Sequence, residues 1–360
     1  MFWRRVLAGA AGLGLLPLAY ADPLADPVKP DEDLLLFPTL CWPAEAGDGW
    51  QAELHAWVYE PPLIEAREAW RWLAGEVPVE DGEEILLRER LRWFLVDNER
   101  GKRLRLQVGA TEFVTPPTTP DGHTRAQVSL TEPAAAVRYQ APDGRQFAAP
   151  LACAPRGGVS VISDIDDTLK ISEVHDARAL LANTFLRPWQ AVEGMAGLYK
   201  ELASHPGTRF HYLSASPWQL YVPLADFFAA EGLPEGSFHL KSFRLKDRSF
   251  FSLFADPYAY KLGLLEGLFS RLDGRRFILV GDSGEQDPEV YAEMARRYPG
   301  RVRAIVIREV GAVEPAVADA RYAAAWDGLD DVALYRFAGD VPDELRKALS
   351  ALAAADEPIP

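Results

Sequence analysis

The hydrophobic pattern of the chain changes near residue 156. In the first part, apolar and polar residues alternate over short stretches between Pro- and Gly-rich turns, which is typical of strands with one buried face. Two further stretches carry Leu, Ile and Trp at helical spacing instead. The pattern therefore predicts a mostly-β, sandwich-like domain with a helical insertion over residues 30–153. The predicted strands are 50–59, 103–108, 124–130, 136–140 and 145–151, and the predicted helical stretches are 63–74 and 83–96.

Beyond residue 156, short apolar runs alternate with helical stretches. This order is typical of a parallel sheet, so residues 157–315 are predicted to form a doubly wound α/β domain. Ser216, Asp256 and Asp287 each precede a proline, a combination that marks helix starts. Residues 316–360 are predicted to form a C-terminal helical extension. The predicted strands of this part are 159–163, 209–213, 276–280 and 302–308.

The most distinctive stretch is VSVISDIDDTLK, at residues 159–170. Its apolar strand ends in Asp164 and Asp166, and Thr168 follows. Because side chains alternate along an extended chain, the two carboxylates leave the strand on the same side, at the end where open parallel sheets bind ligands. Such a pair needs a cation or a shared proton, and Mg²⁺ prefers carboxylate oxygens. The alternative is an acidic loop, since the same spacing occurs at residues 31–33.

The ends of the other predicted strands supply further candidate residues. Ser214 follows one strand, Asp282 follows another, and Asp287 comes five residues later. Each has a structural alternative, because Ser214 can be a turn hydroxyl beside a capping Ser216, and Asp287 can cap the helix that begins at the next proline.

A buried cation is also predicted. Lys261 shares a helical stripe with Leu265, Leu268 and Leu272, so its side chain is expected to face inward. The alternative is an aliphatic stem that lies along the helix end with its ammonium in water. Lys241 and Lys246 are the other candidates for the same role.

Several motifs resemble those of a known enzyme superfamily. DIDDT at residues 164–168 and GDSGEQD at residues 281–287 resemble the first and last motifs of the haloacid dehalogenase superfamily of phosphohydrolases. SDIDDTLKISEV and YLSASPWQL are similar to the actin-patch-protein type of phosphatidate phosphatase and its bacterial relatives. The resemblance covers about residues 159–310 and implies a haloacid dehalogenase-like fold. The N-terminal half is only loosely similar, and no function is carried over from it.

The resemblance implies a role for each matching residue. Asp164 would attack phosphorus and form an aspartyl-phosphate, and Asp166 would protonate the leaving alcohol and then activate water. Ser214 would hold a phosphate oxygen, and Lys261 would neutralise charge on the nucleophile and the transferred group. Thr168 matches the hydroxyl position of the first motif. The implied Mg²⁺ ligands are the carboxylates of Asp164 and Asp282, the main-chain carbonyl of Asp166, and Asp287, which would bind the metal or its water.

The resemblance also bears on the substrate. It implies hydrolysis of phosphatidate or a related lipid phosphate, and the short spacing between the motifs leaves no room for a large inserted cap, which suits a bulky substrate. Residues 238–254 mix cations with phenylalanines, and each cation near an anionic membrane contributes about 1 kcal/mol. The alternative is that the phenylalanines are core and the cations are solvated. The candidate lipid-docking residues are Lys241, Phe243, Arg244, Lys246, Arg248, Phe250, Phe251 and Phe254.

Charge and the N-terminal residues narrow the range of functions. The formal charge of -15 over 360 residues argues against nucleic acid as a partner. Arg4 and Arg5, a short apolar run and an Ala-Tyr-Ala site form the three parts of a secretory signal, with cleavage expected after Ala21. The mature protein is then periplasmic or secreted, by the general or the twin-arginine route. An uncleaved anchor is the alternative. The sequence does not indicate an oligomeric state.

The chain has two cysteines, Cys41 and Cys153. An oxidising compartment permits them to form a disulfide, which would close a loop of 112 residues. Two separate buried thiols are the alternative.

Three functions therefore stand at this stage. A Mg²⁺-dependent phosphatidate phosphatase is favoured by the resemblance, and a soluble phosphomonoesterase of the cell envelope is favoured by the export signal. A binding protein that retains the fold without activity is disfavoured, since every catalytic position is filled.

Overall fold

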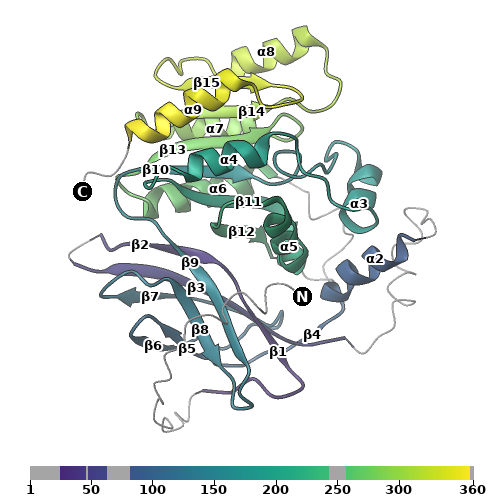
Figure 1. Cartoon of the computed structure of the whole chain (residues 1–360), viewed down its shortest axis with the longest axis vertical. Helices are drawn as coiled ribbons and strands as arrows, with labels where there is room; N and C mark the ends of the chain where they lie inside the picture. Colours follow the sequence, from purple (N-terminus) through teal and green to yellow (C-terminus); the bar gives the residue numbers. More distant parts are fainter. Residues whose placement is uncertain (1–24, 46–47, 63–81, 243–256, 357–360) are drawn as a thin grey trace.

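The computed structural model describes residues 25–45, 48–62, 82–242 and 257–356, which form two sheets (Figure 1). The N-terminal sheet has the strand order β1-β3-β2-β9-β8-β5-β6, with β4 and β7 also paired to β3. Its pairs are antiparallel except for the parallel pair β2–β9. Its strands are β1 (Asp33–Leu36), β2 (Thr39–Pro43), β3 (Trp50–Glu60), β4 (Asp97–Asn98), β5 (Arg105–Val108), β6 (Thr111–Val114), β7 (His123–Leu130), β8 (Ala136–Gln140) and β9 (Gln146–Cys153).

The five strands predicted for this part are confirmed as β3, β5, β7, β8 and β9, whereas β1, β2, β4 and β6 were not predicted. The predicted helix at 83–96 is shorter, with α2 (Glu84–Leu91) and a 3-10 turn η1 (Arg92–Phe94), because the chain then turns to pair β4 with β3. The stretch 63–74 and the secretory signal lie outside the described residues.

A disulfide joins Cys41 on β2 to Cys153 on β9, so the predicted pairing is confirmed. The two residues are register partners in the parallel pair β2–β9. The disulfide therefore lies within the N-terminal sheet, at the strand end from which the chain continues into the second sheet.

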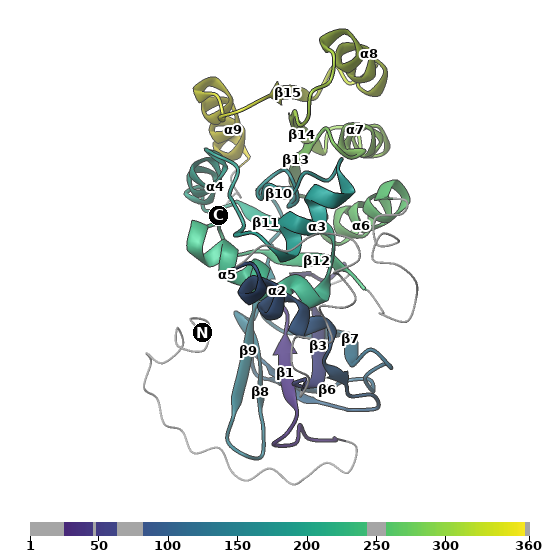
Figure 2. The same cartoon turned by 90° about the vertical axis from the view of Figure 1, so that its right-hand side faces the viewer.

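The second sheet is parallel, with the strand order β12-β11-β10-β13-β14-β15. Helices cover both faces: α4, α5 and α9 lie on one side and α6, α7 and α8 on the other (Figure 2). The structure thus confirms a mixed α/β region after a mostly-β one. The strands are β10 (Val159–Asp164), β11 (Arg209–Pro217), β12 (Ser237–Lys241), β13 (Arg276–Asp282), β14 (Val302–Arg308) and β15 (Ala333–Phe337). The helices are α3 (Ala177–Phe185), α4 (Met195–Ala203), α5 (Tyr221–Glu231), α6 (Pro257–Arg271), α7 (Asp287–Arg297), α8 (Pro315–Ala325) and α9 (Asp343–Ala355), with a 3-10 turn η2 (Trp218–Leu220) before α5.

Two strands of this sheet, β12 and β15, were not predicted. β15 lies in the segment for which only helices were expected, and it pairs in parallel with β14. The tail is therefore an integral part of the sheet, which it extends by one strand.

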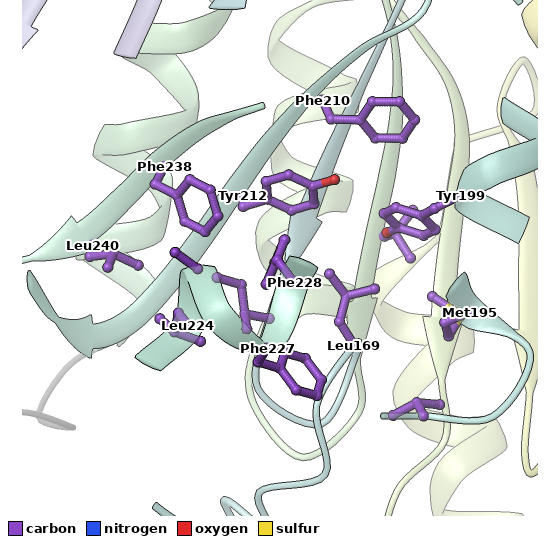
Figure 3. Packing of buried hydrophobic residues seen from close by; sticks show 14 of the residues in the cluster. Leu169, Met195, Tyr199, Phe210, Tyr212, Leu224, Phe227, Phe228, Phe238 and Leu240 are labelled. Carbon is purple, nitrogen blue, oxygen red and sulfur yellow. The ribbon is translucent and has the colours of Figure 1, made fainter. Parts of the chain in front are cut away.

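The face of the parallel sheet that α4 and α5 cover is packed with aromatic side chains (Figure 3). The ring of Tyr212 on β11 lies 4.7 Å from that of Phe228 on α5 and 5.3 Å from that of Phe238 on β12. The same cluster continues into the N-terminal sheet, where Phe37 lies 4.5 Å from Trp218. One cluster of buried side chains therefore spans both sheets. Among the helices described, none is long and apolar enough to cross a membrane.

Candidate active site

The candidate residues meet at the carboxyl edge of the parallel sheet. β10 lies between β11 and β13, so the strand order changes direction at β10, and such a switch point is where ligands bind in open α/β sheets. Asp164 ends β10, Asp282 ends β13, and Ser214 lies near the end of β11. The structure therefore brings together side chains that are more than a hundred residues apart in the sequence.

An acidic cluster surrounds one buried lysine. Carboxylate oxygens of Asp164, Asp282 and Asp287 lie within 4.8 Å of one another, and all three residues are buried. Lys261 Nζ lies 2.8 Å from Asp164 Oδ1, 2.6 Å from Asp287 Oδ1 and 2.7 Å from Glu285 Oε2. Three carboxyl groups thus pair with a single ammonium, and the carboxylate of Asp282 lies beside them.

The titration of this cluster follows from its burial. Removal from water raises the pKa of Asp164 well above its usual value, against the opposing attraction of Lys261. Burial, together with the charge of Asp287, likewise raises the pKa of Asp282. Burial lowers the pKa of Lys261, but the neighbouring carboxylates together raise it well above its usual value, so this lysine stays charged.

The acidic cluster fits a hard divalent cation. Asp164 Oδ2 and Asp282 Oδ2 are buried and have no hydrogen-bond partner among the described residues. Buried charged oxygens are costly unless they are paired or coordinate a metal, and Mg²⁺ takes carboxylate oxygens. The residues present therefore match a site for a hard divalent cation better than a structural ion-pair network, in which these oxygens would have partners.

Asp166 has a separate set of partners. Its Oδ1 accepts from Ser172 Oγ at 2.7 Å and pairs with Lys170 Nζ at 2.8 Å. Its Oδ2 accepts from Ser214 Oγ at 2.6 Å and from Ser216 Oγ at 3.0 Å. Burial alone would raise the pKa of Asp166. The charge of Lys170 and these hydrogen bonds outweigh burial, so the pKa lies well below its usual range. Asp166 is therefore ionised in this arrangement.

Two predicted helix caps are wrong. Ser216 does not cap a helix, because β11 continues to Pro217 and the extended backbone directs the Ser216 hydroxyl to Asp166. Asp287 is the first residue of α7 rather than its cap, and its carboxylate accepts from Lys261 and from the backbone N–H of Asp282. The N-cap position is Gln286. In both cases the side chain forms its hydrogen bonds with residues of the candidate active site and does not cap a helix.

Asp167 shapes the turn that carries the first motif. Its φ of 55° lies in the left-handed region, which Asp tolerates better than most residues. Its carboxylate accepts from the backbone N–H groups of Ser172, Glu173 and Val174. Thr168 is buried in the same turn, and its hydroxyl has no partner among the residues described.

Lys170 and Glu285 are site residues that were not predicted from the sequence. Lys170 comes four residues after Asp166, and Glu285 lies inside the GDSGEQD motif, so both could have been found as charged residues within the quoted motifs. Of the alternatives to Lys261, Lys241 lies 5.5 Å from the ring of Tyr260. Lys246 lies outside the described residues.

Contacts from outside the catalytic edge hold Lys170. Its ammonium lies 5.0 Å from the ring centre of Trp189, which is also 4.5 Å from the guanidinium of Arg90 on α2. Arg90 donates to the backbone carbonyls of Thr184 and Arg187, at and just beyond the end of α3. Burial lowers the pKa of Arg90 to about 10, so it remains charged. The N-terminal part of the chain thus contacts the loop that supports the first motif.

The predicted lipid-docking segment is described only at its start. Lys241 is half-buried at the end of β12. The remaining candidates, Phe243, Arg244, Lys246, Arg248, Phe250, Phe251 and Phe254, lie outside the described residues. Their role therefore stays a prediction.

Comparison with known proteins agrees with the motifs. Residues 159–309 match the family described as phosphatidate phosphatase APP1, catalytic domain. The chain is 36% identical over 159 residues to an uncharacterized protein of Schizosaccharomyces pombe, which is 43% of this chain and 26% of that protein. It is 35% identical over 155 residues to phosphatidate phosphatase APP1 of Saccharomyces cerevisiae, which is 42% of this chain and 26% of that protein. The matched region spans about a quarter of the length of these relatives. The resemblance to the actin-patch-protein type of phosphatidate phosphatase is thus confirmed for residues 159–309, which match the catalytic-domain family of phosphatidate phosphatase APP1.

Proposed function

We propose that this chain is a Mg²⁺-dependent phosphatase of the haloacid dehalogenase superfamily that hydrolyses phosphatidate or a related lipid phosphate. The observation that carries the proposal is the setting of Asp164, whose Oδ1 pairs with Lys261 while its Oδ2 has no partner among the described residues. One oxygen is thus held in place and the other is left for chemistry. The family match of residues 159–309 supports phosphatidate as the substrate.

Asp164 acts as the nucleophile in this proposal. One of its carboxylate oxygens attacks phosphorus, the bond from phosphorus to the alcohol oxygen breaks, and an aspartyl-phosphate forms. A bound Mg²⁺ would supply positive charge that lets a carboxylate approach a phosphate dianion, with Asp164, Asp282, Asp287 and the main-chain carbonyl of Asp166 as its protein ligands. The ammonium of Lys261 pairs with Asp164 Oδ1 and keeps this carboxylate oriented.

Asp166 serves as the acid and then as the base. It must carry a proton when the alcohol leaves, although Lys170 and three serine hydroxyls favour its ionised form. If Ser214 and Ser216 turn to donate to the entering phosphate, Asp166 loses two of these hydrogen bonds and binds a proton more readily. After giving that proton to the alkoxide, Asp166 accepts one from the water that attacks the aspartyl-phosphate. Phosphate leaves and Asp164 is restored.

The chain acts outside the cytoplasm in this proposal. The secretory signal supports export, and the Cys41–Cys153 disulfide is typical of proteins in an oxidising compartment. Mass spectrometry of the protein from the cell envelope should give an N-terminus at Asp22; a chain that retains Arg4 and Arg5 would refute cleavage.

The test of the activity is phosphate release by the mature protein with Mg²⁺. Phosphatidate in mixed micelles is compared with soluble phosphomonoesters, with the Asp164→Asn variant as the blank. We expect higher kcat/KM for the lipid and none for the variant. Cleavage of soluble esters alone would contradict the assignment of a lipid substrate. If neither class of substrate released phosphate, the proposal that the chain is a phosphatase would be contradicted.

A further inference from the structure

The ammonium of Lys261 is surrounded by carboxylate oxygens. Lys261 lies on α6, which packs beside α7 on one face of the parallel sheet (Figure 2). Oxygens of Asp164, Glu285 and Asp287 lie 2.8, 2.7 and 2.6 Å from its Nζ. An ammonium carries three N–H groups, so these three oxygens use its whole donor capacity. A phosphate oxygen can therefore accept a hydrogen bond from Lys261 only after one of the three carboxylates has moved away.

Two of the three carboxylates are fixed in place. Asp164 is 2% exposed and ends β10, in the middle of the sheet. Asp287 is fully buried, and its Oδ2 accepts from the backbone N–H of Asp282 at 3.2 Å. The Asp287 carboxylate also packs directly against the backbone of Gly281, where an added Cβ would collide with it. Neither side chain can leave Lys261 without breaking other contacts of the site.

Glu285 is the third partner, and it has a path to water. Its side chain is 14% exposed, compared with 3% or less for the other two carboxylates. The residues on either side of it, Gly284 and Gln286, are exposed. Its backbone is held independently of Lys261, because Arg321 donates to the Glu285 carbonyl at 2.6 Å. The Glu285 side chain can therefore rotate toward solvent while the loop between β13 and α7 stays in place.

The substrate supplies an anion that can replace Glu285. Asp164 Oδ1 pairs with the same ammonium, so a phosphoryl group that Asp164 attacks arrives beside Lys261. A phosphate monoester carries more negative charge than a carboxylate, and Lys261 attracts it more strongly at the same distance. Departure of Glu285 also removes a negative charge from the position that the phosphate enters. Both effects favour an exchange of Glu285 for phosphate.

We propose that the Glu285 carboxylate occupies a phosphate position at Lys261 until the substrate binds, and that the phosphoryl group then displaces it. After hydrolysis, the returning carboxylate competes with the product phosphate for the same ammonium and so promotes its release. Glu285 is thus a positioning residue that acts through Lys261. The inference rests on the proposed phosphatase function and adds an exchange of ion pairs before and after the chemical steps.

Binding of inorganic phosphate tests this exchange without turnover. Phosphate is titrated calorimetrically, with Mg²⁺ in excess, into the full-length mature protein and two variants. Glu285→Gln removes the charge of the competing side chain. Glu285→Ala also removes its polar group, so a new hydrogen bond from the glutamine amide to phosphate cannot explain a gain seen in both. Each variant is expected to bind phosphate about tenfold more tightly than the wild type, the change typical of one charge-assisted hydrogen bond.

A matched control removes a different carboxylate from the same region. Glu293 on α7 pairs with Arg297 at 2.7 Å, so Glu293→Gln makes the same chemical change without altering the partners of Lys261. This variant should bind phosphate with the Kd of the wild type. Thermal unfolding of all four proteins checks that each is folded at the temperature of the titration.

Steady-state kinetics give a second readout. In Glu285→Gln, the KM for phosphatidate and the inhibition constant of the product phosphate should both fall about tenfold, and kcat should not rise, because phosphate is held more tightly at Lys261. If Glu285 served only to orient Lys261, its replacement would raise KM or lower kcat without tightening the binding of phosphate.

The outcomes separate this inference from the function on which it rests. Equal or weaker phosphate binding by Glu285→Ala would overturn the exchange, even if the wild type hydrolyses phosphatidate and Glu285→Gln binds phosphate more tightly. Tighter binding by both variants, with no hydrolysis of any ester by the wild type, would refute the phosphatase and keep the exchange. Phosphate binding by none of the proteins would also overturn the exchange.

Discussion

Replacement of Lys261 by methionine tests the charge balance of the acidic cluster. Lys261 is 2% exposed and its ammonium pairs with Asp164, Glu285 and Asp287, so the variant leaves two buried carboxyl groups and a half-buried one without their cation. Removal of one partner from a buried ion pair costs about 3–5 kcal/mol. At about 2.1 cal/mol/K of unfolding entropy per residue, a chain of 360 residues loses about 1.3 °C of Tm per kcal/mol, which gives a decrease of about 4–7 °C without divalent metal. Lys347→Met, at an exposed position on α9, is the control.

Added Mg²⁺ and a lower pH should each reduce the loss of stability of the Lys261→Met variant. A cation that binds only the folded state stabilises it by about 2.7 kcal/mol at a hundredfold excess over Kd, and the variant should gain more from Mg²⁺ than the wild type does. Burial raises the pKa values of Asp164 and Asp282, and the charge of Lys261 opposes that rise. The folded variant therefore binds more protons than the folded wild type, and the stability difference between them should narrow as the pH falls from about 8 to about 5.5.

The measurement is thermal unfolding of the wild type and both variants, in a chelator and across a Mg²⁺ titration. A Lys261→Met variant whose Tm in chelator stays within about 1 °C of the wild type would refute the account, since that is less than 1 kcal/mol. An equal Mg²⁺-induced rise in all three proteins would show that the metal binds elsewhere.

Three further predictions concern catalysis and stability. Asp164→Asn should abolish turnover and leave the Tm nearly unchanged, as checked by phosphate release and circular dichroism; appreciable residual activity would exclude this nucleophile. Lys170→Met should raise the pKa of Asp166, because Asp166 Oδ1 loses the cation that lies 2.8 Å away; the basic limb of the pH profile for alkyl phosphates, which reports loss of the proton from Asp166, should therefore move to higher pH, and an unmoved limb would contradict this role of Lys170. Cys41→Ser with Cys153→Ser should lower the free energy of unfolding by about 4–5 kcal/mol in the chain-entropy account of a loop of 112 residues, measured by urea denaturation, and a loss below about 1 kcal/mol would contradict it.

The sequence predicts the parallel sheet best where its strands are buried on both faces. The apolar runs of β10, β13 and β14 stand out because neither face needs polar residues. β12, with the sequence SFHLK, and β15, with ALYRF, are edge strands whose polar residues interrupt the run. A short edge strand is stabilised by pairing with a neighbouring strand that is distant in the sequence. The local pattern of residues does not report that pairing.

The candidate active site, like the parallel sheet, could be predicted only in part from the sequence. Asp164, Ser214, Asp282 and Lys261 could be predicted because each follows a strand or faces inward from a helix, and the sheet brings them together. The partners of Asp166 could not be predicted in this way. Ser216 was mistaken for a helix cap, because the extension of β11 to Pro217 depends on pairing with β12 rather than on local preference.

The match to known catalytic domains ends at residue 309, but the folded unit does not. β14 ends at Arg308, and a chain cut there would lose β15 and leave the apolar β14 as a free sheet edge, which invites pairing between molecules and aggregation. A cut before residue 159 would likewise remove Arg90, which satisfies carbonyls at the end of α3. A recombinant catalytic fragment should therefore keep α2 at one end and α9 at the other, even though neither lies in the region that defines the family.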